Sequence, residues 1–412
     1  MIKYHKYVLS NGLRLLVTED GSTPLVSVNT LFDVGSRDED PNRTGFAHLF
    51  EHLMFGGTPN VPDYDRVVTA MGGENNAMTN NDFTQYYLTV PAGSLKDALW
   101  LEADRMRMLD FSQRSLSVQQ SVVTEEYHYR YVNQPYGDVW LLLRPLCYKQ
   151  HPYRWCTIGS DIRHVQDATL DDVKDFFSRY YCPDNAILSV VGNVNADEVA
   201  QMVETLYGDI KRGTPKGRSL PREPEQTEPR FMRVERPVPA DALYMAYPMC
   251  DRLHPDFPVV DLISDILSNG RSSRLFNELV KNRGLFTEID AYITGDRDPG
   301  LFVVSGKLRQ GVDFGIARQA VEKELARISE EKLEERELAK VVNKYESTFV
   351  FSQYKALDCA MGLCYYEWLG KVEWVNCEPQ LYRRVTTGDI QRVATNLFRP
   401  EHQSLLYYAG IK

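Results

Sequence analysis

A proline-rich and highly charged segment at residues 211–230 divides the chain into two parts of similar length. Its sequence, KRGTPKGRSLPREPEQTEPR, contains four prolines and only one large apolar residue, Leu220. Such a segment can hardly bury a face against a core, so it is typical of a linker between domains. We therefore predict an N-terminal domain at 1–210, a linker at 211–230 and a C-terminal domain at 231–412.

The two parts resemble each other near their ends. Residues 169–192 align without a gap with residues 386–409, at a constant offset of 217 positions. Each begins with a threonine followed three residues later by an aspartate, at Thr169 and Thr386, and continues through an amphipathic helix, a proline and a β-rich run. Helix, proline and strand are a common local order, but the similarity over 24 positions favours two domains of one fold.

Hydrophobic periodicity indicates strands that are neighbours along the chain, with helices grouped after them. The first part contains a hairpin at Asn11-Gly12, a strand at 25–34, a helix at 45–55, a strand pair at 76–90, and helices at 94–109, 115–131 and 138–146. The second part is less regular and includes a long charged helix at 314–351. This order predicts an α+β fold with two similar αβ domains, each a sheet with helices packed on one face.

Composition excludes several classes of function. The 47 Lys and Arg residues face 57 Asp and Glu residues, and no long basic stripe occurs, so we expect no nucleic-acid partner. No stretch reaches the roughly 18 to 20 apolar residues of a membrane span, and the N-terminal residues hold no apolar run of secretory length. We expect a cytoplasmic protein, or a periplasmic one if a signal was removed. The seven cysteines form no CxxC pair, which predicts buried free thiols.

The segment GFAHLFEHLMFGGTPN, which starts at Gly45, carries the clearest chemical signal. It places His48, Glu51 and His52 in the order H-x-x-E-H. On a helix, residues three and four apart share a face, so both imidazoles point to one place with the carboxylate beside them. That arrangement suits a hydrolytic Zn²⁺ site, which takes three protein ligands and leaves a position for water. Glu51 is then the expected general base.

Two histidines and a glutamate at this spacing also occur by chance on solvated helices. Here the flanking residues are apolar nearly all round the helix, so it is expected to be buried, and buried polar groups need partners. A metal satisfies all three side chains together.

A third ligand is expected from SLSVQQSVVTEEYHYRY, in which two glutamates end a helical run. Glu126 follows Val123 and Val122 by three and four residues, whereas Glu125 shares only Val122 at that spacing, so we favour Glu126. His128 is a rival ligand, although its Tyr- and Arg-rich surroundings indicate an exposed helix end.

With these residues in place, the chain resembles the pitrilysin/insulysin family of inverted-motif zinc metallopeptidases, the inverzincins. The resemblance includes HLFEH followed by MFGGT, a glutamate 74 residues beyond the second histidine, and GGENNAMTNNDFTQYY, HPYRWCTIGS and SNGRSSRLF. Within this family, the chain is similar to the bacterial and mitochondrial-processing-peptidase-like branch. The family implies zinc on His48, His52 and Glu126, with Glu51 as general base, and two αβ domains that form a clamshell around an extended peptide.

The resemblance also implies where a peptide substrate binds. In such enzymes the peptide is added as a strand to a sheet edge near the metal. Asn76 and Ala77 match that edge and would lie along the substrate. Taken alone, the Asn-rich sequence NNAMTNND is more simply interpreted as a turn between strands.

The chain departs from the family pattern at three positions. A second acidic residue often stands seven positions before the liganding glutamate, where this chain has Gln119. In the second half, single-chain members carry an arginine and, seven residues on, a tyrosine that hold the substrate carbonyl. The matching positions are Val280 and Thr287, and neither can do this.

Two explanations compete for the missing clamp. Arg283 and Tyr292 could act from shifted positions, or a separate homologous subunit could provide the pair in a heterodimer. We favour the heterodimer. The sequence therefore predicts a zinc-dependent endopeptidase or oligopeptidase subunit that hydrolyses extended peptides. The alternatives are a non-catalytic scaffold and a peptide-binding subunit of the same fold.

Overall fold

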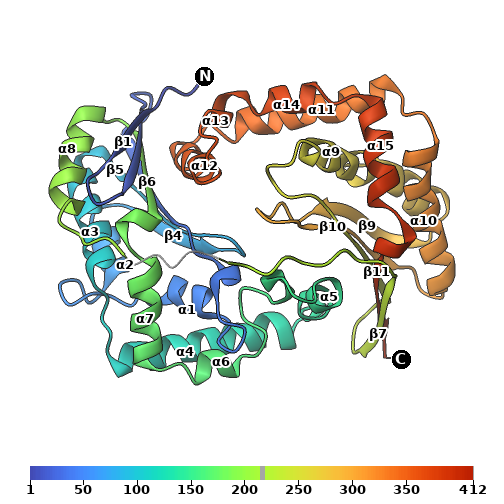
Figure 1. Cartoon of the computed structure of the whole chain (residues 1–412), viewed down its shortest axis with the longest axis horizontal. Helices are drawn as coiled ribbons and strands as arrows, with labels where there is room; N and C mark the ends of the chain where they lie inside the picture. The colour runs from blue at the N-terminus through green and yellow to red at the C-terminus, as the bar shows by residue number, and fades with distance from the viewer. Residues whose placement is uncertain (214–218, 412) are drawn as a thin grey trace. The chain divides into compact units, whose positions relative to one another are not determined.

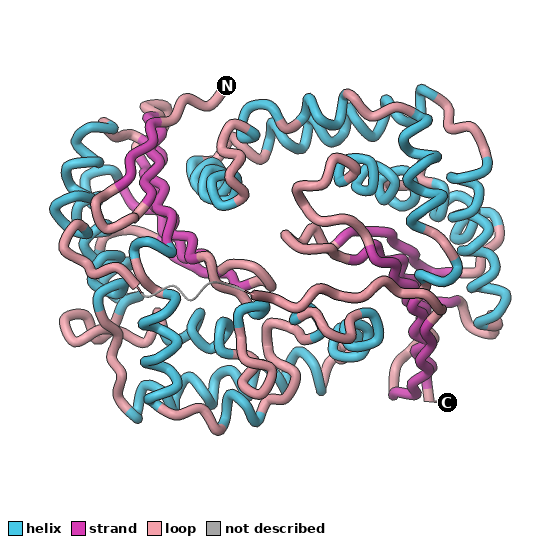
Figure 2. The backbone as a smooth tube through the Cα atoms, viewed as in Figure 1, coloured by secondary structure: helices cyan, strands magenta, loops and turns pink. Residues whose placement is uncertain are grey.

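The computed structural model describes residues 1–213 and 219–411, which group into two compact units with one sheet each (Figure 2). Unit 1 comprises residues 1–129, 155–221 and 350–376, and unit 2 comprises residues 130–154, 222–349 and 377–412. The predicted α+β class with two similar sheet-plus-helix domains is confirmed. The units differ from the predicted ranges because one segment of each half of the chain packs in the other unit.

Unit 1 is built on a six-stranded mixed sheet (Figure 1). In spatial order the strands are β1 (His5–Val8), β2 (Arg14–Glu19), β6 (Ala186–Gly192), β3 (Leu25–Phe32), β5 (Thr84–Pro91) and β4 (Glu74–Thr79). β2 and β6 are parallel, and all other neighbours are antiparallel. β6 is buried along its whole length, as expected of a central strand that is covered on both faces. β4 is the outer strand next to β5.

The helices of unit 1 lie between and after its strands along the chain. They are α1 (Phe46–Leu53), α2 (Tyr64–Ala70), α3 (Leu95–Arg107), α4 (Gln113–Tyr127), α6 (Arg163–Gln166), α7 (Leu170–Tyr180), α8 (Ala196–Tyr207) and α12 (Ala356–Trp368). A π-helical turn at His128–Val132 continues α4, and α13 (Trp374–Cys377) contains the boundary between the units. α1, α3, α7 and α8 come from the first half of the chain, whereas α12 comes from the second half.

α12 covers a sheet face that carries several polar side chains. Ser189 Oγ donates to the carbonyl of Ala360, and the Cys364 thiol lies 3.6 Å from the carbonyl oxygen of Asn29. Trp368 Nε1 donates to Asp33 Oδ1 at 2.6 Å. Because these groups are satisfied by a helix more than 160 residues away in sequence, unit 1 is completed only by the second half of the chain.

Unit 2 repeats the topology with five strands. In spatial order they are β7 (Arg230–Arg236), β11 (Ser404–Gly410), β8 (Ala242–Pro248), β10 (Leu301–Leu308) and β9 (Phe286–Ile293). β7 and β11 are parallel and the other pairs are antiparallel. The order therefore matches that of β2, β6, β3, β5 and β4 in unit 1.

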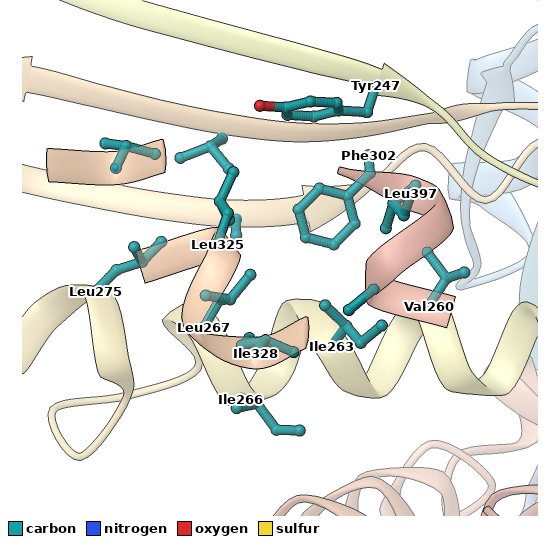
Figure 3. Close-up of a cluster of buried hydrophobic side chains, with 14 of the residues drawn as sticks. Tyr247, Val260, Ile263, Ile266, Leu267, Leu275, Phe302, Leu325, Ile328 and Leu397 are labelled. Carbon is teal, nitrogen blue, oxygen red and sulfur yellow. The ribbon is translucent and has the colours of Figure 1, made fainter. Parts of the chain in front are cut away.

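The helices of unit 2 enclose a large apolar core. They are α5 (Val139–Cys147), α9 (Phe257–Ser268), a π-helical segment at Phe276–Asn282, α10 (Phe314–Glu330), α11 (Glu335–Phe351), α14 (Pro379–Arg383) and α15 (Thr387–Leu397). Figure 3 shows Ile263 and Ile266 of α9 in a cluster that includes Leu325, Phe302 and Leu397. The opposite face of the sheet is covered by α5 from the first half, through Leu143 against Ala246 and Val303.

The predicted repeat has a structural counterpart in both units. Thr169 and Thr386 each cap a helix, and each receives a hydrogen bond from the backbone amide three residues on. In both of these capping boxes, the aspartate three residues after the threonine accepts a hydrogen bond from the backbone amide of the threonine. α7 and α15 are offset by 217 residues, and the strands β6 and β11 that follow are central in their sheets.

Two predicted elements differ from the structure. The single helix expected at 314–351 is wrong, because α10 ends at Glu330 and α11 begins at Glu335. The turn between them buries Leu333, which is 3% exposed, and no glycine or proline marks it. The predicted linker has no helix or strand in its described part before Arg230, and residues 214–218 lie outside the described residues. Its second half is not a loose spacer.

Residues 222–229 are anchored to unit 2. Glu223 accepts hydrogen bonds from three successive backbone amides, those of Lys149, Gln150 and His151. Gln226 is 4% exposed and donates to the carbonyls of Glu401 and Gln403. All seven cysteines are free, and five of them are buried, whereas Cys250 and Cys377 are partly exposed. Among the helices of the described residues, none has the length and apolar character needed to span a membrane.

Candidate metal centre

α1 is a short, buried helix whose chemistry lies on one side. Its N-cap is Gly45, with a φ of 90° that favours glycine, and a Cβ there would meet the carbonyl oxygen of Ile158 at 2.8 Å. Phe50 stacks on Phe176 and Tyr181, with ring centroids 5.0 Å away in both pairs. The apolar residues therefore fix the helix against α7, and the H-x-x-E-H side chains take the remaining face.

His48, His52 and Glu126 come together between α1 and the last turn of α4. Glu126 Oε2 lies 3.2 Å from His48 Nε2 and 3.3 Å from His52 Nε2. The donor atoms of the three side chains all lie within 4.8 Å of one another, and no other such group of three occurs among the described residues. Glu51 Oε2 lies 3.4 Å from His48 Nδ1. The arrangement presents two imidazole nitrogens and one carboxylate oxygen to a common point.

The structure places the rival residues outside this group. Glu125 and His128 are exposed, whereas the side chain of Glu126 is only 16% exposed. The sequence argument for Glu126 was partly wrong, because Val122 is 43% exposed and only Val123 faces the core.

The electrostatics of the group describe a metal-free site. Burial lowers the pKa of His48, but the hydrogen bonds and charges of Glu126 and Glu51 outweigh it and raise that pKa to about 9. Burial raises the pKa of Glu51, but His48, the Thr79 side chain and His52 outweigh it, and the net pKa is lowered. Without a metal, His48 is therefore an imidazolium that donates to both carboxylates.

One observation tests whether a metal fits these residues. His52 Nε2 is buried and makes no hydrogen bond, although it lies 3.3 Å from Glu126 Oε2. A buried nitrogen without a hydrogen bond is costly unless something occupies its lone pair. Two imidazoles and a carboxylate are also the ligand types of hydrolytic zinc sites. The residues present therefore fit Zn²⁺.

β4 runs next to this group as the outer strand of the sheet. Asn76 is exposed and pairs with Tyr87, and Ala77 is 9% exposed and pairs with Tyr86. The backbone amide of Ala77 donates to Asn76 Oδ1 at 2.8 Å. The Asn-rich sequence thus begins in strand β4, and the predicted turn follows this strand at residues 80–83.

Sequence reasoning missed the residues that hold the two helices in place. Glu39 accepts from two backbone amides at the start of α1. Gln120 of α4 donates to three carbonyls in and just after α6, those of Val165, Gln166 and Ala168. Neither residue stands in a recognisable motif, since each acts on backbone atoms of another segment.

The four positions considered for the oxyanion clamp, in the second half of the chain, all lie in unit 2. Val280 packs against the apolar core, and Thr287 is exposed on β9, where its hydroxyl donates to the carbonyl of Lys307. Tyr292 packs beside Trp140, with ring centroids 6.4 Å apart, and burial raises its pKa to about 12. Arg283 is exposed after the π-helical segment.

Comparisons with known protein families cover both halves of the chain. The family model described as Insulinase (Peptidase family M16) matches residues 14–139, which include the whole candidate centre. The model described as Peptidase M16 inactive domain matches residues 167–345.

Two similar proteins carry protease names. Zinc protease PqqE of Helicobacter pylori is 28% identical over 415 residues, which cover 98% of this chain and 92% of that protein. The uncharacterized zinc protease YmxG of Bacillus subtilis is 25% identical over 312 residues, which cover 74% of this chain and 73% of that protein.

Solved structures share the fold over the full chain. A protease from Helicobacter pylori has a TM-score of 0.92 at 26% identity, with 99% of this chain and 100% of that chain covered. The periplasmic protease PqqL from Escherichia coli has a TM-score of 0.80 at 19% identity, with 99% of this chain but 47% of that chain covered.

Proposed function

The chain belongs to peptidase family M16, and we propose that it is a zinc-dependent endopeptidase or oligopeptidase subunit. The observation that carries this proposal is the convergence of His48, His52 and Glu126, with Glu51 beside them. The protease names of similar proteins support the same reaction class. Its substrates would be extended peptides.

His48, His52 and Glu126 are the residues that would hold zinc. When bound, the ion would supply Lewis acidity, which polarises a carbonyl and lowers the pKa of water. Glu126 would neutralise part of its charge, and the two histidines would act as neutral ligands after losing any extra proton. Gln120 and Glu39 would keep the helices of these ligands in place.

Glu51 would act as the general base. Its side chain is 21% exposed, which leaves it accessible to water, and its lowered pKa keeps it ionised at neutral pH. A Glu51 oxygen would take a proton from the attacking water as the new C–O bond forms. The same carboxyl would return that proton to the leaving amine as the C–N bond breaks.

The free edge of β4 would receive the peptide as an added strand. Asn76 is exposed along this edge, and the Ala77 amide now bonded to Asn76 Oδ1 could donate to a substrate carbonyl instead. Recognition through backbone atoms places little demand on the substrate sequence.

We further propose that a homologous subunit completes the site. Val280 packs against a core and Thr287 has a short neutral side chain, so neither can stabilise a developing oxyanion as an Arg/Tyr pair would. This chain matches 47% of PqqL, which leaves room in that longer chain for a second copy of the fold. The partner would carry the Arg/Tyr pair in a heterodimer.

The test combines zinc content with hydrolysis of a mixed library of internally quenched peptides. Glu126→Gln should lose zinc, and Glu125→Gln on the same helix is its matched control and should keep it. Glu51→Gln should keep zinc and lose all cleavage. The wild-type chain should cleave slowly alone and faster with a homologue that carries the Arg/Tyr pair.

Each part of the proposal has its own contrary result. Zinc content near zero in the wild type would contradict the metal site and favour the scaffold alternative. Bound zinc without cleavage, alone or with such a homologue, would leave a peptide-binding subunit. Full turnover by the chain alone would refute the need for a partner.

A further inference from the structure

Glu39 places a buried carboxyl group at the N-terminus of α1. The residue is 7% exposed, and its two oxygens accept separate hydrogen bonds. The backbone amide of Gly45 donates to Oε2 at 2.9 Å, and that of Ala47 donates to Oε1 at 2.8 Å. Glu39 is not a ligand in the candidate metal centre and is not the general base proposed above.

α1 has no cap of its own. The first amides of a helix have no partner within it, and a side chain at the N-cap usually accepts from them. Here the N-cap is Gly45, which has no side chain, and its φ of 90° together with the close carbonyl of Ile158 excludes other residues. Glu39 supplies the acceptor from six residues upstream.

The position of this cap matters because a ligand lies in the first turn. His48 directly follows Ala47, whose amide Glu39 holds, whereas His52 lies one turn further along. His48 Nε2 must stay near Glu126, which belongs to α4. Fraying of the first turn would therefore move one ligand while leaving the other in place.

The loop that carries Glu39 is itself fixed. Trp155 Nε1 donates to the carbonyl of Ser36 at 2.8 Å, and the backbone amide of Glu39 lies 3.4 Å from the same carbonyl. On the other side of the cap, the Thr44 hydroxyl lies 3.0 Å from Ser160 Oγ and 2.9 Å from His164 Nδ1. The carboxyl group is thus held on a rigid support.

We propose that Glu39 is a positioning residue for the metal centre, which holds the first turn of α1 and thereby aims His48 at Glu126. The inference rests on the proposed zinc site. It adds that removing a side chain that never touches the metal weakens zinc binding through one ligand only.

The chain offers a matched control for a simple loss of stability. Asn195 caps α8 in the same unit, and its Oδ1 accepts from the amides of Asp197 and Glu198, both at 3.1 Å. α8 carries no residue of the candidate centre. Asn195→Ala therefore removes the same kind of contact, two backbone amides on one side chain, without affecting a ligand.

The experiment compares Glu39→Ala, Glu39→Gln and Asn195→Ala in the full-length chain. The metal-free proteins are studied by ¹H–¹³C correlation spectra of the histidine rings, with the His48 and His52 signals assigned by substitution. Both Glu39 variants should shift or broaden the His48 signal and leave that of His52 unchanged. Asn195→Ala should change neither signal.

Zinc affinity, measured by competition with a chromogenic chelator, gives the second readout. Glu39→Ala should weaken binding at least tenfold and Asn195→Ala less than threefold. Glu39→Gln should fall between them, since its carboxamide can accept from only one of the two amides. An unchanged His48 signal and zinc affinity in both Glu39 variants, with only a lower melting temperature, would overturn the proposal.

The two readouts separate this inference from the proposed function. If the wild-type chain binds no zinc, the function fails, and the His48 signal of the metal-free protein still decides the role of Glu39. If zinc binds and the His48 signal is insensitive to Glu39, the zinc site stands and the positioning role is refuted.

Discussion

Zinc binding should compete with a proton on His48. In the metal-free protein, Glu126 and Glu51 raise the pKa of this imidazole to about 9 against the effect of burial. A histidine ligand must be neutral, so at any pH below about 9 the proton has to leave before the metal binds. We expect apparent zinc affinity to rise with pH and binding at pH 7 to release this proton.

The size of the effect follows from the pKa. Each pH unit well below 9 should cost roughly tenfold in affinity, so binding at pH 7 should be about 100-fold weaker than binding to the fully deprotonated site, or about 3 kcal/mol. The metal-free fold should show the opposite trend. The pKa of His48 is raised above its unfolded value of 6.5, so its ion pairs stabilise the fold by at most about 3 kcal/mol below pH 6.5. That stabilisation is lost as the pH rises through 9.

The assay is calorimetric titration of zinc at pH 7 in two buffers with different ionisation enthalpies, together with chelator competition between pH 6 and 9. Glu51→Gln provides the internal comparison, because it removes one of the carboxylates that raise the pKa of His48 but no zinc ligand. This variant should release fewer protons and bind zinc more tightly at pH 7. An affinity that is flat across the range, with no proton release, would refute the reasoning.

The remaining predictions concern the fold. Arg105→Met should lower the free energy of unfolding in urea by about 3 to 5 kcal/mol, because Glu102 stays buried without its ion pair, and adding Glu102→Gln should recover part of the loss. Thr386→Ala should cost about 1 kcal/mol in the same assay through loss of its capping bond. A fragment of residues 1–213 should not unfold cooperatively, because it lacks α12, and fusing residues 350–376 to it should restore a transition. Cooperative melting of the fragment alone would contradict this.

Local patterns in the sequence predicted the parts of the site that depend on one helix. The spacing of His48 and His52 needs only helical periodicity, and the burial of α1 follows from its apolar flanks. The capping boxes at Thr169 and Thr386 are equally local, since donor and acceptor lie three residues apart. The structure contains these features as predicted because they depend only on residues that are close in sequence.

Features that depend on distant segments were beyond sequence reasoning. α5 packs in unit 2 and α12 packs in unit 1, where each covers one face of the sheet. Hydrophobic periodicity does not indicate which sheet a helix covers. The break at residue 331 is set by the burial of Leu333, in a run that otherwise continues a helical pattern. Glu39 lies in an acidic stretch, and nothing in that stretch indicates that its carboxyl group accepts hydrogen bonds from two backbone amides.

The repeat itself argues that the chemistry belongs to the side chains and not to the fold. By order along the chain, α9 and α11 of unit 2 correspond to α1 and α4 of unit 1. α9 has two aspartates four residues apart, Asp261 and Asp265, and α1 has two histidines at the same spacing. Tyr382 donates a hydrogen bond to Asp261. Burial raises the pKa of Asp265, and the positive charge of Lys344 on α11 partly offsets this effect. Both aspartates therefore have partners within the protein. In unit 1 the corresponding helices leave a buried imidazole nitrogen without a hydrogen bond. One topology thus supports a hydrogen-bonded polar network in one copy and a group of candidate metal ligands in the other.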